Sequence, residues 1–137
     1  MIIFGLDGKE RKWNPKGGCR DRKTSKLHQT AVKIVDKLLP HDTILEEVKL
    51  DGTKTERHGV LYLDIYLPLR RVAIEVQGQQ HFEFNTFHYK NKMDFFRATA
   101  RDRSKKNWCD INNIVLINLD YNEDEDEWTK RISRAIS

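Results

Sequence analysis

Cysteine is scarce in this sequence, with only Cys19 and Cys109 among 137 residues. The two lie far apart and neither belongs to a Cys-x-x-Cys pair, which excludes a zinc knuckle and a disulfide framework. A chain of this length buries about two-thirds of its unfolded surface, so it requires no such staple. The sequence therefore predicts one domain that folds in a reducing, intracellular setting.

Long apolar runs are also lacking. No run approaches the length that spans a membrane, and Met1 to Leu6 is too short for a signal peptide. We therefore expect a soluble protein with no membrane partner. Its expected place is the cytoplasm, that of the host cell if a phage encodes the chain.

The most informative stretch runs from residue 60 to residue 84, where two β-rich runs flank Pro68 to Arg71. If these four residues form a hairpin loop, side-chain alternation places Ile65 opposite Ile74 and Asp64 opposite Glu75. The facing carboxylates then have Cβ atoms about 5 Å apart. One face of the ribbon is predicted to be apolar at every pair, through Leu63, Ile65, Leu67, Val72, Ile74 and Val76.

Carboxylates this close repel each other unless positive charge lies between them. Oxygen ligands of this kind suit Mg²⁺ or Mn²⁺. The spacing therefore predicts that Asp64 and Glu75 share one such cation. The alternatives are an ion pair with Arg70 or Arg71, or a solvated sheet edge.

The order Asp64, ten residues, then Glu75-Val76-Gln77 resembles the PD-(D/E)XK nuclease signature in its Glu-x-Gln variant. Residues 78–82 and 101–108 are similar to small phage and bacterial endonucleases related to the very-short-patch repair enzyme, some of them homing endonucleases. The likeness covers residues 25–136. It implies a Mg²⁺- or Mn²⁺-dependent endonuclease that hydrolyses double-stranded DNA in a site-specific manner, with the metal held by Asp64, Glu75 and the backbone carbonyl of Val76. The structural zinc of the very-short-patch enzymes has no counterpart in these cysteines.

Three further residues are candidates for catalysis. In that family a Lys occupies the place of Gln77, so Gln77 can orient a water but adds no charge. His81 is the candidate for the missing donor or general acid, with a structural role as the alternative. His28 stands where these endonucleases often place a metal- or water-holding Glu, and its alternative is a surface histidine near a helix start.

The net charge of +4 conceals a basic excess from Lys9 to Lys37 and an acidic run from Asp120 to Glu127. Basic clusters are often only solvated surface, but beside a phosphodiester-cleaving site they suit a phosphate backbone. The predicted DNA-binding residues are Arg20, Arg22, Lys23, Lys26, Lys90, Lys92, Arg97, Arg101 and Lys105.

Periodicity and capping signals predict a single α/β domain, with a central mixed sheet flanked by helices in the order αβββαβα. This is also the core order of the restriction-endonuclease-like PD-(D/E)XK fold. Residues 1–24 are predicted to be a basic arm with little regular structure, and 25–137 the nuclease domain. The other elements are a helix from a Ser25 cap to Pro40, a strand over 43–50, a helix from Met93 to Lys106, a fully buried parallel strand over 114–119, and a last helix after a capping box at 122–125.

Two other functions stay open at this point. One is a structure-specific endonuclease that resolves branched DNA, and the other is a DNA-binding protein on the same fold without catalysis. Target choice depends on surface loops and on the geometry of any homodimer, which the sequence does not define.

Overall fold

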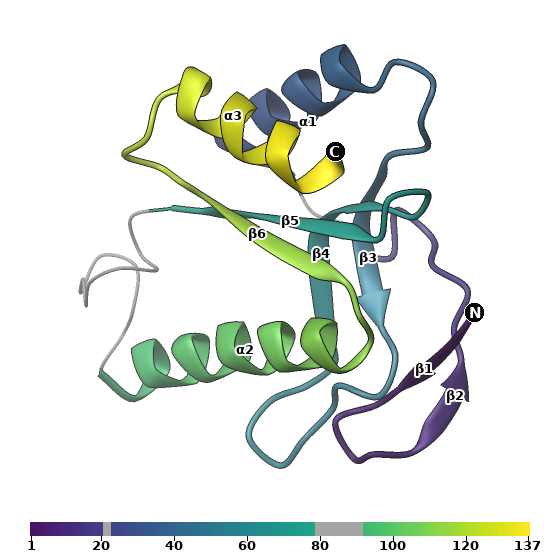
Figure 1. Ribbon diagram of the computed structural model, residues 1–137. Coiled ribbons are helices and arrows are strands. Elements are labelled where there is room, and N and C mark those ends of the chain that lie inside the picture. The colour runs from purple at the N-terminus through teal and green to yellow at the C-terminus, as the bar shows by residue number, and fades with distance from the viewer. Residues whose placement is uncertain (21–22, 79–91) are drawn as a thin grey trace.

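A four-stranded mixed sheet lies between helices in the computed structural model, which describes residues 1–20, 23–78 and 92–137 (Figure 1). The sheet order is β3-β4-β5-β6, antiparallel except for the parallel β5–β6 pair. The predicted α/β class and the late parallel strand are therefore confirmed. The strands are β3 (Leu45–Leu50), β4 (Leu61–Leu67), β5 (Val72–Gln77) and β6 (Val115–Asp120).

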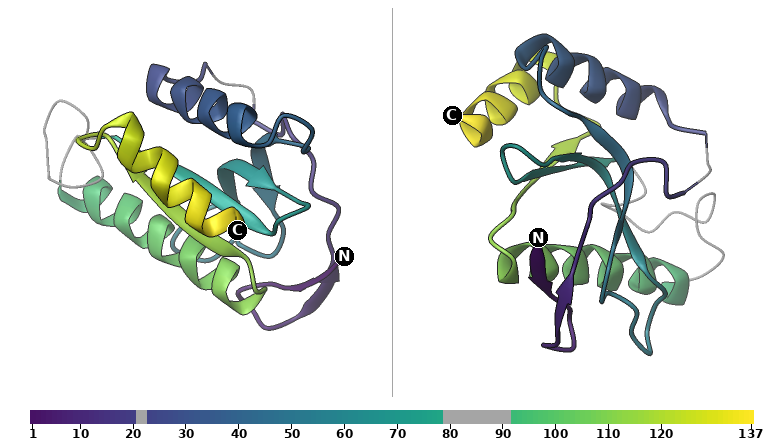
Figure 2. Two further views of the ribbon diagram at one scale, coloured as in Figure 1. Left: turned by 45° about the horizontal axis from the view of Figure 1, so that its top comes forward. Right: turned by 90° about the vertical axis from the view of Figure 1, so that its right-hand side faces the viewer.

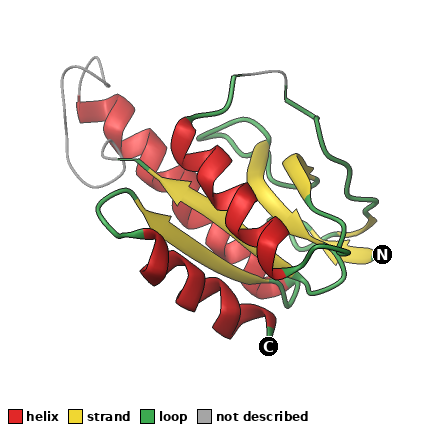
Figure 3. Ribbon diagram, turned by 90° about the horizontal axis from the view of Figure 1, so that it is seen from above, coloured by secondary structure: helices red, strands yellow, loops and turns green. Residues whose placement is uncertain are grey.

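The helices form the two outer layers (Figure 2, Figure 3). On one face lie α1 (Lys26–Leu38) and α3 (Glu125–Ile136), which share a core cluster with β4, β5 and β6. On the other face lies α2 (Lys92–Ile111), whose Trp108 and Cys109 are fully buried. No helix of the described residues is long and apolar enough to cross a bilayer.

The helix starts follow capping chemistry. Ser25 caps α1 as predicted, because its hydroxyl accepts from the His28 N–H at 3.1 Å. For α3 the predicted box at 122–125 is wrong, since the cap is Asp124, which accepts from the Glu127 N–H at 2.9 Å. Glu123 instead pairs with Arg131 and accepts from the Asp120 N–H, so it belongs to the turn before the helix.

The N-terminal segment contradicts the expectation of little regular structure. It forms a hairpin of β1 (Ile2–Phe4) and β2 (Glu10–Lys12). Ile3 and Trp13 are buried in the core on the α2 side. The Trp13 indole donates to the Lys49 carbonyl at 3.1 Å and meets Trp108 edge-on, with ring centroids 5.0 Å apart. The basic N-terminal segment therefore packs into the core through a few large apolar side chains.

Strand β6 is not buried on both faces as predicted. It is the last strand in the sheet order, and Val115 at its start is 51% exposed. Its continuous apolar run resembles that of an inner strand, yet only Leu119 is fully buried. Periodicity cannot distinguish an inner strand from a helix-covered edge strand.

The predicted single apolar face of the β4–β5 ribbon is split between two cores. Leu63 packs with Trp108 on the α2 side, whereas Ile65 and Leu67 pack on the α1 and α3 side. The alternation therefore breaks at Asp64, which the register places opposite Glu47. Glu47 has a left-handed backbone with φ of 53°, uncommon for a non-glycine residue in a strand. This break occurs at the predicted acidic site.

Candidate functional site

Strands β4 and β5 separate at the two predicted carboxylates. Their pairing runs from Leu67↔Val72 to Ile65↔Ile74 in the predicted register. At the next position, the Asp64 N–H donates to Glu75 Oε2 and the Val76 N–H donates to Asp64 Oδ2, each at 2.9 Å. Each carboxylate thus replaces a backbone acceptor of the ladder, which satisfies the buried N–H groups while the strands diverge.

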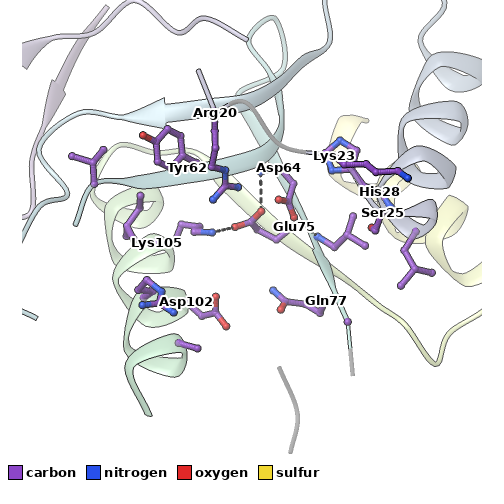
Figure 4. Close-up of a pocket in the computed structure, with 17 residues that line it drawn as sticks. Arg20, Lys23, Ser25, His28, Tyr62, Asp64, Glu75, Gln77, Asp102 and Lys105 are labelled. Carbon is purple, nitrogen blue, oxygen red and sulfur yellow. Dashed lines mark hydrogen bonds and ion pairs between the residues drawn. The ribbon is translucent and has the colours of Figure 1, made fainter. Parts of the chain in front are cut away.

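A cavity of about 520 Å³ lies where the strands diverge, and Figure 4 shows its lining. It is formed by the segment before α1, the first turn of α1, the adjoining parts of β4 and β5, and one face of α2. The structure thus brings together residues far apart in the chain. The predicted residues that line it are Arg20, Lys23, His28, Asp64, Glu75, Val76, Gln77, Arg101 and Lys105.

Glu75 is the most deeply buried acid of this cavity, with 4% of its surface exposed. Its carboxylate pairs with the Lys105 ammonium from α2. Burial raises the pKa of Glu75, the Lys105 charge opposes this, and the Asp64 carboxylate raises it further. Burial alone lowers the pKa of Lys105, but Glu75 outweighs that effect and the pKa is raised. Lys105 was predicted to bind phosphate from the surface, whereas the structure places it against an acid inside the cavity.

A second group of potential ligands lies beside Asp64. Single ligand atoms of His28, Glu47 and Asp64 all lie within 4.8 Å of one another. His28 is 3% exposed, so its interpretation as a surface histidine is wrong. Its Nε2 lies 2.8 Å from Glu46 Oε1. An imidazole with two carboxylates fits Mn²⁺ better than Mg²⁺, which prefers oxygen ligands alone.

Glu47 was missed from the sequence. It is 4% exposed, and Arg20 Nε donates to its Oε2 at 2.8 Å. The Arg20 guanidinium also lies over the Tyr62 ring, 4.8 Å from its centroid. The available signal was the Glu-Glu pair within a predicted strand, since alternation turns one member inward. The left-handed backbone that directs Glu47 toward Asp64 has no sequence signature.

Gln77 lies farther along β5, at the boundary with β6. Its Nε2 donates to Asn118 Oδ1 at 2.8 Å. Among the described residues, no donor lies within hydrogen-bond distance of its buried Oε1. Within the described part of the chain, this oxygen is therefore a buried acceptor without a donor at the cavity wall. His81, Arg22 and Lys90 lie outside the described residues, so their predicted roles stay predictions.

The remaining predicted DNA-binding residues divide by position. Arg101 and Lys23 are exposed at the cavity wall. Lys26, Lys92 and Arg97 are exposed but do not line the cavity. Arg97 Nη1 lies 3.4 Å from Asp94 Oδ1, so it forms an ion pair on its own helix. The exposed cations at the cavity wall, Lys23 and Arg101, form its basic rim. This rim is smaller than the predicted set of DNA-binding residues.

Three viral proteins are similar to parts of this chain. Uncharacterized protein 307L of Invertebrate iridescent virus 6 is 36% identical over 61 residues, which are 44% of this chain and 31% of that protein. Uncharacterized protein 094L of Frog virus 3 is 33% identical over 78 residues, which are 56% of this chain and 50% of that protein. The matched part thus spans 31% to 50% of the length of these relatives. No protein-family model and no solved structure matches the chain.

Proposed function

We propose that the chain is a metal-dependent endonuclease that cleaves double-stranded DNA, in the manner of the site-specific homing enzymes. The observation that carries the proposal is the cavity at the diverging ends of β4 and β5. It brings together the carboxylates of Asp64 and Glu75, each of which accepts a hydrogen bond from the backbone of the other's strand. A buried histidine and exposed cations from separate segments also line it. Buried acids within reach of a basic rim suit phosphodiester hydrolysis, which requires both a cation site and phosphate contacts.

The donor set fits a divalent cation in two overlapping ways. Asp64 belongs to both, either with Glu75 and the Val76 carbonyl or with His28 and Glu47. Bound there, Mg²⁺ or Mn²⁺ would acidify a water and neutralise charge on the phosphate. The chain itself would position the DNA and the metal ligands. Arg101 and Lys23 hold the DNA backbone at the cavity wall. The hydrogen bonds from the Asp64 and Val76 N–H groups fix both carboxylates.

One observation favours a second function, a DNA-binding protein without catalysis. Two of the acids already pair with cations, Glu47 with Arg20 and Glu75 with Lys105. Such pairs satisfy buried charge without any metal. In this case the basic rim would bind DNA and the cavity would catalyse no reaction.

Nicking of supercoiled plasmid with Mg²⁺ or Mn²⁺ decides between the two functions. The test variant is Asp64→Asn, whose amide oxygen can still accept from the Val76 N–H and preserve the strand ends. The matched control is Asp36→Asn, an exposed acid of α1 away from the cavity. We expect wild type and Asp36→Asn to nick and Asp64→Asn to lose activity. Salt-sensitive DNA binding without nicking would support the binding protein.

A comparison of substrates refines the proposal. A four-way junction and its matched linear duplex, offered side by side, distinguish a resolver of branched DNA from a duplex-cutting enzyme. Preference for the junction would replace the homing-type assignment. Similarity to viral proteins supports a virus-encoded enzyme, which we expect to act in the cytoplasm of the host cell.

A further inference from the structure

The β5 strand leaves the candidate site without a cation of its own. Gln77, two residues beyond Glu75, is neutral and donates to Asn118 on the neighbouring strand. Phosphodiester cleavage concentrates negative charge on the phosphate oxygens, and a fixed cationic donor stabilises that charge most in a water-poor cavity. Such a donor must then reach the cavity from another element.

Lys105 reaches the cavity from α2. Its side chain is 15% exposed, and its ammonium contacts the carboxylate of Glu75 (Figure 4). It lines the main cavity and also a second one of about 330 Å³ that lies toward β6. Glu75 and Gln77 line both cavities as well. Lys105 thus lies between the two cavities, beside the segment of β5 that lines both.

We infer that Lys105 supplies, from α2, the cationic donor that the usual motif carries at the place of Gln77, and that it stabilises the charge on the scissile phosphate. The inference rests on the proposed nuclease function and names a further residue of that site. A lysine ammonium has three N–H donors, and the contact with Glu75 requires only one. The others can donate to a non-bridging phosphate oxygen in the cavity.

The nearby arginines are less suited to this role. Arg101, one helical turn earlier on α2, is exposed and suits a phosphate at the rim. Arg20 already donates to Glu47. Among these cations, Lys105 has the least exposed side chain and directly contacts a predicted catalytic acid.

A purely structural role for Lys105 makes a different prediction. A simple counterion would keep Glu75 ionised in the metal-free protein and would have no part in cleavage. Its removal would then strengthen metal binding, because a competing positive charge is lost, and leave the cleavage rate intact. A catalytic donor also competes with metal, but its loss slows cleavage of bound DNA.

The experiment combines substitutions at positions 105 and 77. Lys105→Met removes the charge and keeps the apolar stem, and Gln77→Lys restores a cation on β5. Lys106→Met is the control, because Lys106 is exposed, lies on the same helix and pairs with Asp110 instead. If Lys105→Met does not fold, Lys105→Gln replaces it, since an amide can still donate to Glu75. Each protein is measured for nicking rate at saturating plasmid, for DNA affinity, and for Mn²⁺ affinity by calorimetry.

We expect Lys105→Met to lose about 10²- to 10³-fold in the rate at saturating DNA, with Mn²⁺ affinity unchanged or tighter. The double variant, which adds Gln77→Lys, should cleave at least about tenfold faster than Lys105→Met alone. Lys106→Met should match wild type. Full cleavage by folded Lys105→Met overturns the inference and leaves the nuclease proposal standing. A double variant as slow as Lys105→Met also overturns it. A wild type that cleaves no DNA overturns both.

Discussion

His28 is the residue that bears most directly on which cation the site prefers. It lies in the first turn of α1, buried, with Nε2 close to Glu46 and within reach of Glu47 and Asp64. A neutral imidazole binds Mn²⁺ more readily than Mg²⁺, which favours oxygen ligands and keeps its waters. If His28 is a ligand, the cavity should therefore discriminate between the two ions.

We predict that His28→Ala weakens stabilisation by Mn²⁺ more than stabilisation by Mg²⁺. The measurement is the rise in melting temperature on adding each ion, since a ligand that binds only the folded state raises that temperature. His41→Ala is the control, because His41 is exposed in the turn after α1. Equal losses for both ions would exclude His28 as a ligand and leave Asp64, Glu75 and the Val76 carbonyl as the metal site.

The two cysteines differ sharply in their surroundings. Cys19 is exposed, whereas Cys109 is buried on α2 and burial raises the pKa of its thiol to about 12. Only the thiolate reacts with disulfide reagents, so a buried thiol with a raised pKa is inert. We predict one fast-reacting thiol in native protein at pH 8 and a second only after denaturation. Cys19→Ser should show no fast phase, and rapid labelling of its Cys109 would mean that the α2 side of the core opens readily.

At the scale of the elements, α3 offers a test of where a helix begins. The Asp124 side chain caps the helix, and its negative charge also favours the helix N-terminus. We predict that Asp124→Ala lowers the free energy of unfolding by about 1 kcal/mol in urea titrations at pH 7. Asn122→Ala, at the predicted but incorrect cap, should change it by less than about 0.5 kcal/mol. A reversed order of the two effects would restore the cap to Asn122.

The helices were more predictable than the strands because their signals are local. Ser25 and Pro40 delimit α1, and Trp128 and Ile132 recur at helical spacing in α3. The strand faces depend on distant contacts. Leu63 lies on the opposite face from Ile65 only because the alternation breaks at Glu47 and Asp64. The β1–β2 hairpin likewise forms where Ile3 and Trp13 find Trp108, more than ninety residues away.

At the scale of the whole molecule, the candidate site could be predicted only in part. Asp64 and Glu75 follow from the hairpin register, since their pairing is a property of adjacent strands. Lys105 does not, because its contact with Glu75 depends on how α2 crosses the sheet. From the sequence alone, Lys105 was one exposed lysine of a basic helix. Tertiary packing makes it a largely buried partner of Glu75, which sequence patterning cannot predict.

Exposed cations lie both at the cavity and away from it. Arg101 is exposed at the cavity wall, whereas Lys130 is exposed on α3 and lines neither cavity. If DNA lies across the cavity, only the first cation neutralises a phosphate and releases a counterion. Both positions carry one positive charge, so removing either changes the net charge equally.

We therefore predict that Arg101→Ala flattens the slope of log affinity against log salt by about 0.9, the contribution of one phosphate contact. Lys130→Ala should leave the slope unchanged within error, although its net charge is the same. The measurement is fluorescence anisotropy of labelled duplexes of unrelated sequence across a salt series without divalent ions. The Arg101→Ala loss should be similar on every sequence, because phosphate contacts read no bases. Equal slopes for both variants would mean that binding depends on net charge alone, and the DNA path across the cavity would then be wrong.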